Sequence, residues 1–116
     1  MEEIIGLLFY ARNLAHIEHL KTKSYAQHMA LGSFYTEVIE LADDLAEAYQ
    51  GCEGIMEDIP LTNITMKGSI DQVLEKQLGM IEKMRDDVSD RSAIQNIIDE
   101  IVQLYLSTIY KLRNLS

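Results

Sequence analysis

The chain has 116 residues, of which 47% are hydrophobic, and a formal net charge of −9. This length allows one domain with a single core, and no apolar run approaches the length of a membrane span. The 10 basic residues are scattered singly, which argues against DNA binding because phosphates are neutralised by clustered Lys and Arg. Cys52 is the single cysteine and the start MEEII is acidic, unlike a secretory signal, so we expect a cytoplasmic protein.

Four stretches carry apolar residues at helical spacing. They cover about residues 2–21, 24–50, 70–88 and 92–114. The links within the first pair and within the second pair are short, whereas residues 51–68 contain the single proline, Pro60, and no sustained period. A long link of this kind allows the second and third helices to run parallel. The sequence therefore predicts one all-α domain over residues 1–116, a ferritin-like four-helix bundle of two helical hairpins joined by a long crossover.

Polar residues and glycines mark several of the helix ends. Thr22 or Ser24 can cap the second helix, and Gly51 is expected to end it in a left-handed conformation. Ser69 followed by Gln72 is the signature of a capping box, which predicts the start of the third helix.

Histidine and carboxylate side chains gather around the first polar break. His16 and His28 lie six residues on either side of Thr22 in the polar break Lys21–Ser24, so a chain reversal centred there would place them side by side on neighbouring helices. The second helix also holds Asp43 and Glu47, four residues apart, whose carboxylates therefore share one face. Imidazole and carboxylate groups together are typical ligands of iron, zinc or manganese.

Spacing along the second helix divides these ligands into two groups. His28 and Asp43 are 15 residues apart, which is about 22 Å along a helix axis. One chain therefore cannot bring all four ligands to one ion. Antiparallel docking of two second helices places the histidine end of one copy against the acidic end of the other. The spacing predicts a metal site shared between subunits, present twice in a homodimer.

The stretch that carries these ligands resembles the Dps-type mini-ferritins. Their motif has a His late in the first helix, a second His twelve residues on, an Asp fifteen beyond that and a Glu four later. This sequence has its candidate ligands at those intervals: His16, His28, Asp43 and Glu47. The resemblance covers about residues 10–51, and beyond them it rests on length and pattern. It implies a ferroxidase that oxidises ferrous iron with peroxide or dioxygen and stores the ferric mineral in a dodecameric shell, as a protection against oxidative stress.

One position departs from that family pattern. Gly32 stands four residues after His28, where the family carries an acidic ligand. The departure implies a di-iron site with a weakened second position, a mononuclear site, or a site completed by Glu18, His19 or water. Otherwise His19 is expected to be exposed or to support the other ligands. The alternative function is a ferritin-like bundle that has lost catalysis and acts as a structural or interaction protein.

Plainer explanations exist for each group taken alone. A histidine pair beside a turn is often a polar helix end, and Asp43 with Glu47 alone is typical of an exposed acidic stripe. Tyr25, Tyr35 and Tyr49 are expected to pack, although a tyrosine near an iron centre can also carry an electron. The metal hypothesis therefore depends on the four ligands occurring together at the intervals of the family.

Overall fold

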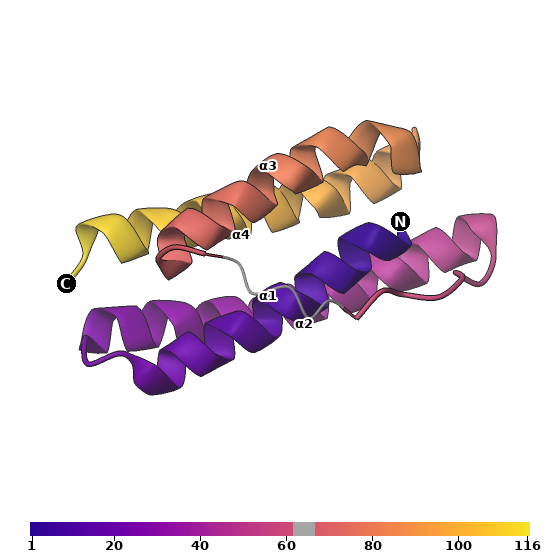
Figure 1. The fold of residues 1–116 in the computed structure, drawn as a ribbon. Coiled ribbons are helices and arrows are strands. Elements are labelled where there is room, and N and C mark those ends of the chain that lie inside the picture. The colour runs from indigo at the N-terminus through magenta and orange to yellow at the C-terminus, as the bar shows by residue number, and fades with distance from the viewer. Residues whose placement is uncertain (62–66) are drawn as a thin grey trace.

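The structure, a computed structural model, describes residues 1–61 and 67–116. These residues form four α-helices and no strand (Figure 1). The helices are α1 (Glu2–Lys21), α2 (Tyr25–Glu53), α3 (Ile70–Val88) and α4 (Ser92–Asn114). The predicted all-α bundle is confirmed, and α1, α3 and α4 begin and end at the predicted residues.

The second helix is longer than predicted at its C-terminal end. Gly51 is helical and α2 continues to Glu53. Gly54 follows with a φ of 92° and a ψ of 179°, a backbone conformation that glycine adopts readily and other residues do not. The prediction that Gly51 ends the helix was wrong, because the chain first leaves helical geometry three residues later.

The two hairpins pack face to face so that every neighbouring pair of helices is antiparallel (Figure 1). α1 lies beside α2 and α3, and α4 lies beside the same two helices. α2 and α3 run in the same direction, which requires a connection that returns along the length of the bundle. Residues 62–66 of the predicted crossover lie outside the described residues, and its described part begins at Gly54.

The described start of the crossover is attached to the beginning of α1. The Glu57 amide donates a hydrogen bond of 2.9 Å to Oε2 of Glu2. The Pro60 carbonyl lies so close to Gly6 that a Cβ added there would be 2.5 Å from the oxygen. A side chain at Gly6 would therefore push the crossover away from α1.

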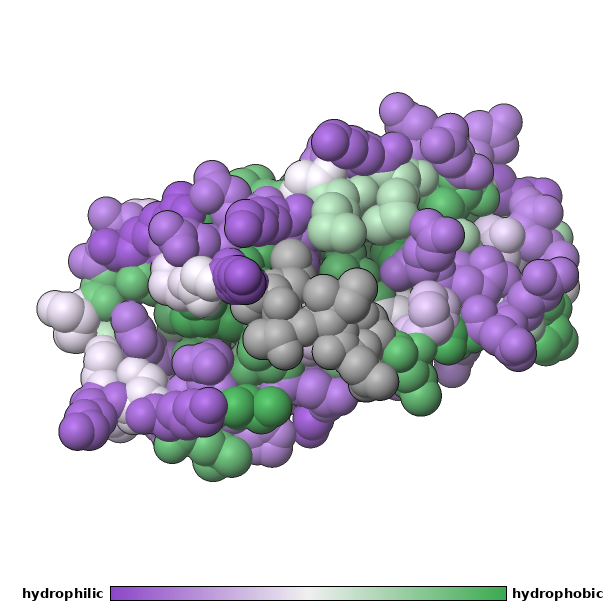
Figure 2. All heavy atoms as spheres, viewed as in Figure 1, coloured by the Kyte–Doolittle hydropathy of each residue, from purple (hydrophilic) through white to green (hydrophobic). Residues whose placement is uncertain are grey.

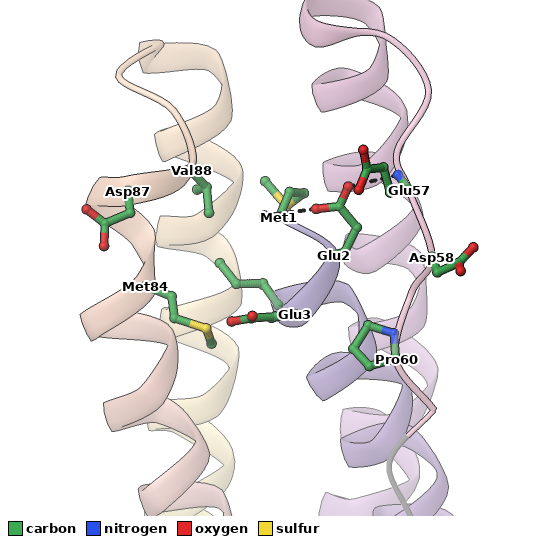
Figure 3. A pocket seen from close by; sticks show the side chains of 10 residues that line it. Met1, Glu2, Glu3, Glu57, Asp58, Pro60, Met84, Asp87 and Val88 are labelled. Carbon is green, nitrogen blue, oxygen red and sulfur yellow. Dashed lines mark hydrogen bonds and ion pairs between the residues drawn. The ribbon is translucent and has the colours of Figure 1, made fainter.

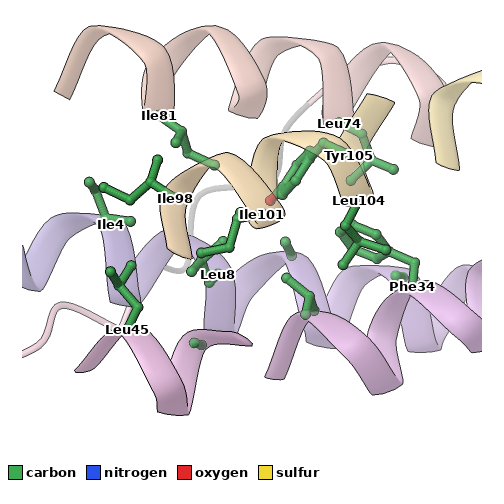
Figure 4. Close-up of a cluster of buried hydrophobic side chains, with 14 of the residues drawn as sticks. Ile4, Leu8, Phe34, Leu45, Leu74, Ile81, Ile98, Ile101, Leu104 and Tyr105 are labelled. Carbon is green, nitrogen blue, oxygen red and sulfur yellow. The ribbon is translucent and has the colours of Figure 1, made fainter. Parts of the chain in front are cut away.

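The core lies between the two hairpins and draws on all four helices (Figure 4). Labelled members are Ile4, Leu8, Phe34, Leu45, Leu74, Ile81, Ile98, Ile101, Leu104 and Tyr105. Burying one such side chain stabilises the fold by about 1.5–3 kcal/mol. The Phe34 and Tyr105 rings meet edge to face, with centroids 5.1 Å apart. The Tyr105 hydroxyl donates to Oε1 of the fully buried Gln77 over 3.0 Å, and burial raises the pKa of Tyr105.

The face of the molecule shown in Figure 2 is mainly polar. Hydrophilic side chains cover much of the face shown in Figure 2, with apolar patches between them. None of the described helices combines the length and apolar character that crossing a membrane requires.

Candidate functional site

The hairpin between α1 and α2 is held by hydrogen bonds within its three-residue turn. The Ser24 hydroxyl accepts the Gln27 amide over 3.2 Å, which caps α2. The Thr22 hydroxyl donates to Oε1 of Gln27 over 3.0 Å and accepts the Ser24 amide over 3.2 Å. Ser24 is therefore the N-cap residue of the two predicted candidates, and the turn has one well-defined geometry.

Two histidines bridge the hairpin just before and just after this turn. The imidazoles of His19 and His28 are stacked, with centroids 3.7 Å apart and an interplanar angle of 19°. Nδ1 of His19 lies 2.6 Å from the His28 carbonyl oxygen, and Nδ1 of His28 lies 2.8 Å from the His19 carbonyl oxygen. Because a carbonyl oxygen only accepts, both Nδ1 atoms must carry the proton and donate it. In the neutral ring this leaves the lone pair on Nε2.

His16, about one turn earlier on α1, makes its ring contact with Tyr35 of α2. Its imidazole stacks on the Tyr35 ring, with centroids 4.3 Å apart and an interplanar angle of 15°. Tyr35 also meets His19 edge to face at 5.2 Å, and the Arg12 guanidinium carbon lies 5.4 Å from the Tyr35 centroid. All three histidines therefore join one aromatic cluster with Tyr35 between α1 and α2.

The ring contacts correct the predicted pairing across the hairpin. His19, not His16, stacks on His28, whereas His16 stacks on Tyr35. The prediction centred the turn on Thr22, but the turn spans residues 22–24 and is centred one residue later. Because of this shift, the part of α1 that lies opposite His28 is nearer to the end of the helix and includes His19 in place of His16.

The acidic pair lies apart from the histidines. Asp43 and Glu47 are both exposed on α2, one helical turn from each other. Along the helix axis they lie about 22 Å and about 28 Å beyond His28. Among residues 1–61 and 67–116, no group of three or more His, Cys, Asp or Glu side chains is arranged to hold a metal ion. In one copy of the chain the candidate histidine ligands and the candidate carboxylate ligands therefore lie far apart along α2.

Gly32 makes room for His19. A Cβ added to Gly32 would lie 3.1 Å from Cε1 and 3.3 Å from Nδ1 of that imidazole. The ring thus occupies part of the space that a longer residue at position 32 would need. A hollow of about 350 Å³ opens beside it. Its lining residues are His19, His28, Met29, Gly32, Ser33, Thr36 and Glu37.

Glu18, the other candidate substitute ligand, lies elsewhere. It lines a separate hollow between α1 and the start of α3, together with Ile70 and Val73. The structure therefore groups His19 with His28 and places Glu18 on a different side of α1.

Sequence reasoning named Tyr35 and Gly32 but did not predict their contacts with the histidines. Tyr35 follows His28 by seven residues, which is about two helical turns, so both lie on one face of α2. That spacing was a usable signal for Tyr35. The contact between Gly32 and His19 had no comparable signal, because it depends on how two helices meet.

A larger acidic hollow lies at the opposite end of α1 (Figure 3). It measures about 830 Å³ and is lined by Met1, Glu2, Glu3, Ile4, Glu57, Asp58, Pro60, Met84, Asp87 and Val88. Hydrogen bonds from the main-chain amides of Glu2 and Glu57 lower the pKa of the Glu2 carboxyl. This carboxylate therefore holds the crossover in place.

Comparison with known proteins places the chain in a family without assigning it an activity. A family model described as "Family of unknown function (DUF5856)" matches residues 19–112. The chain belongs to this family. The part matched by DUF5856 contains His19, His28, Asp43 and Glu47, whereas His16 precedes it.

One curated relative is described as an uncharacterized 14.6 kDa protein in the mobD-ri intergenic region of Enterobacteria phage T4. It is 32% identical over 117 residues, which cover 96% of this chain and 86% of the relative. No significant match was found among solved structures.

Proposed function

We propose that two copies of this chain form a two-fold dimer that binds and oxidises ferrous iron at two shared sites. Each site combines His16 and His28 of one copy with Asp43 and Glu47 of the other. Iron is the substrate, and peroxide or dioxygen is the electron acceptor. The ferric product is stored, and a dodecameric shell assembled from such dimers would hold it. The Dps-like intervals motivate this reaction, and the separation of the half-sets on α2 motivates the dimer.

The hydrogen bonding of His28 is the observation that carries the proposal. Metal-binding histidines usually donate their second ring N–H to a carbonyl or carboxylate, which fixes the tautomer and the ring orientation. His28 donates Nδ1–H to the His19 carbonyl over 2.8 Å, so its Nε2 is oriented and available as a ligand. His19 has the matching arrangement. These side chains fit a ferrous ion by ligand type and by tautomer.

In this proposal His19 replaces the acidic ligand that the family carries at the position of Gly32. Its imidazole fills space beside Gly32 and contacts His28, whereas Glu18 faces another hollow. Of the side chains offered as replacements for the missing carboxylate, His19 is therefore the one favoured by position. A site with one fewer carboxylate binds one iron ion more readily than two, because fewer negative charges balance the cations.

The chain's own groups have distinct tasks in iron oxidation. Neutral imidazoles bind the ferrous ion, and the two carboxylates add negative charge that favours the ferric product. The acidic surface of a chain with a net charge of −9 raises the local concentration of cations.

A structural or interaction role is the second candidate, and one feature of the other hairpin favours it. There Arg85 Nη2 donates to the Gln95 carbonyl over 3.1 Å, while Gln95 Nε2 donates to the Arg85 carbonyl over 2.8 Å. The same reciprocal arrangement therefore joins α3 to α4 without any metal ligand. By analogy, His19 and His28 would then serve to hold α1 against α2.

Complementation between two inactive variants tests the shared site. One variant carries His16→Ala and His28→Ala, and the other carries Asp43→Asn and Glu47→Gln. Each is expected to lose iron oxidation, measured as ferric absorbance after anaerobic Fe²⁺ loading and exposure to peroxide or air. Unfolding and refolding an equal mixture makes half of the dimers mixed, and each mixed dimer has one intact site. The expected rate is about one quarter of the wild-type rate.

Gln95→Ala is the matched control, because it removes the corresponding hairpin contact without touching a candidate ligand. It is expected to oxidise iron at the wild-type rate, and circular dichroism shows whether each variant is folded. Folded mixed dimers that stay inactive would refute the shared site. A wild-type dimer that oxidises iron no faster than buffer would refute the ferroxidase and favour the structural role.

A further inference from the structure

Tyr35 is in direct ring contact with the candidate iron ligands His16 and His19. Its ring is stacked on His16 with centroids 4.3 Å apart and meets His19 edge to face at 5.2 Å. His19 is in turn stacked on His28 at 3.7 Å. An unbroken series of ring contacts therefore runs from Tyr35 to each of the three histidines.

Reduction of hydrogen peroxide at a site with one iron ion requires a second electron donor, and the Tyr35 ring can be that donor. Reduction of hydrogen peroxide to water takes two electrons, whereas one ferrous ion supplies one. A site that holds a single iron ion must obtain the second electron elsewhere or release hydroxyl radical. Gly32 in place of a carboxylate and His19 beside it favour one iron ion per site.

We propose that Tyr35 supplies this second electron, an inference that rests on the proposed iron oxidation. In the complete step, one Fe²⁺, one hydrogen peroxide, the Tyr35 phenol and one proton give Fe³⁺, the Tyr35 phenoxyl radical and two water molecules. The O–O bond breaks, and iron and the phenol each lose one electron. The phenol also loses its proton, which with the proton from solvent completes the two waters. His16 is the shortest route for the electron, because its ring lies against that of Tyr35.

Arg12 favours loss of the phenol proton together with the electron. Its guanidinium carbon is 5.4 Å from the Tyr35 centroid, and its Nη1 donates to Oδ1 of Asn13 over 3.1 Å. A positive charge held near the ring opposes a cation radical but leaves a neutral phenoxyl radical unaffected.

Two other tyrosines have less suitable positions. Tyr105 is fully buried in the core and donates to Gln77. Tyr110 is exposed on α4, a helix that carries no candidate ligand. Tyr49, in contrast, lies two residues beyond Glu47, so in the proposed dimer it lies near the site that Glu47 completes. Tyr110→Phe is therefore the control for Tyr35→Phe, and each change keeps the ring and removes only the hydroxyl.

The test loads the dimer with one Fe²⁺ per site, adds one equivalent of hydrogen peroxide and freezes the sample for electron paramagnetic resonance. Wild type and Tyr110→Phe are expected to show a tyrosyl radical together with ferric iron. Tyr35→Phe should still form ferric iron, lose the radical signal, and release severalfold more hydroxyl radical to a spin trap. Its melting temperature should match that of wild type.

The outcomes separate this inference from the function on which it rests. Iron that stays ferrous in the wild-type protein overturns the proposed function. Iron that is oxidised without a tyrosyl radical, or with a radical that persists in Tyr35→Phe, overturns the role of Tyr35 alone.

Discussion

Two helical glycines differ in a way that predicts opposite responses to the same substitution. Gly79 lies in α3 and is exposed, and a Cβ added there would meet nothing within 4 Å. Gly32 lies in α2, where an added Cβ would be 3.1 Å from Cε1 of His19. Replacing glycine by alanine inside a helix is worth about 1 kcal/mol when nothing obstructs the methyl group. Gly79→Ala should therefore stabilise the protein, and Gly32→Ala should not.

The size of the effect follows from the geometry around His19. In Gly32→Ala the imidazole must shift by a few tenths of an ångström, which strains the 2.6 Å contact between Nδ1 of His19 and the His28 carbonyl. A hydrogen bond contributes about 1 kcal/mol net, which offsets the helical gain. At about 2.1 cal/mol/K of unfolding entropy per residue, 1 kcal/mol in this chain of 116 residues corresponds to about 4 °C in Tm.

Thermal unfolding of four variants checks this reasoning. Gly79→Ala should raise Tm by about 4 °C, whereas Gly32→Ala should leave it near the wild-type value. In a His19→Ala background the obstructing ring is gone, so Gly32→Ala should recover the full gain. An equal rise in Tm for Gly32→Ala and Gly79→Ala in the wild-type background would refute the steric role of His19.

Two further predictions concern a buried hydrogen bond and acid stability. Tyr105→Phe removes the donor to the buried Gln77 and should lower the free energy of unfolding in urea by about 1–3 kcal/mol, with a smaller loss when Gln77→Leu is added. Hydrogen bonds from Ser69 and then Arg113 lower the pKa of Asp71. Its stabilisation is therefore complete above about pH 4 and lost as pH falls through the folded-state pKa. Asp71→Asn should be less stable than wild type at neutral pH, with a difference that disappears near about pH 2. An undiminished difference at that acidity would contradict the assignment.

The all-helical fold could be predicted because its determinants are local. Apolar residues at helical spacing predict the four helices, and the capping box of Ser69 and Gln72 forms at the start of α3. The exception is the end of α2, since Gly51 can remain helical when no turn is required there. Length and composition of the second link also indicated the parallel course of α2 and α3, because a short link cannot return along a bundle.

The candidate site divides in the same way between local and tertiary causes. Separation of His28 from Asp43 along one helix follows from the rise per residue alone. The rise per residue does not determine which residues face each other across the hairpin. Moving the turn by one residue shifts a helix by about 1.5 Å and rotates its side chains by about 100°. Only the tertiary structure therefore paired His19 with His28, placed Tyr35 against His16, and showed that Gly32 leaves space for an imidazole.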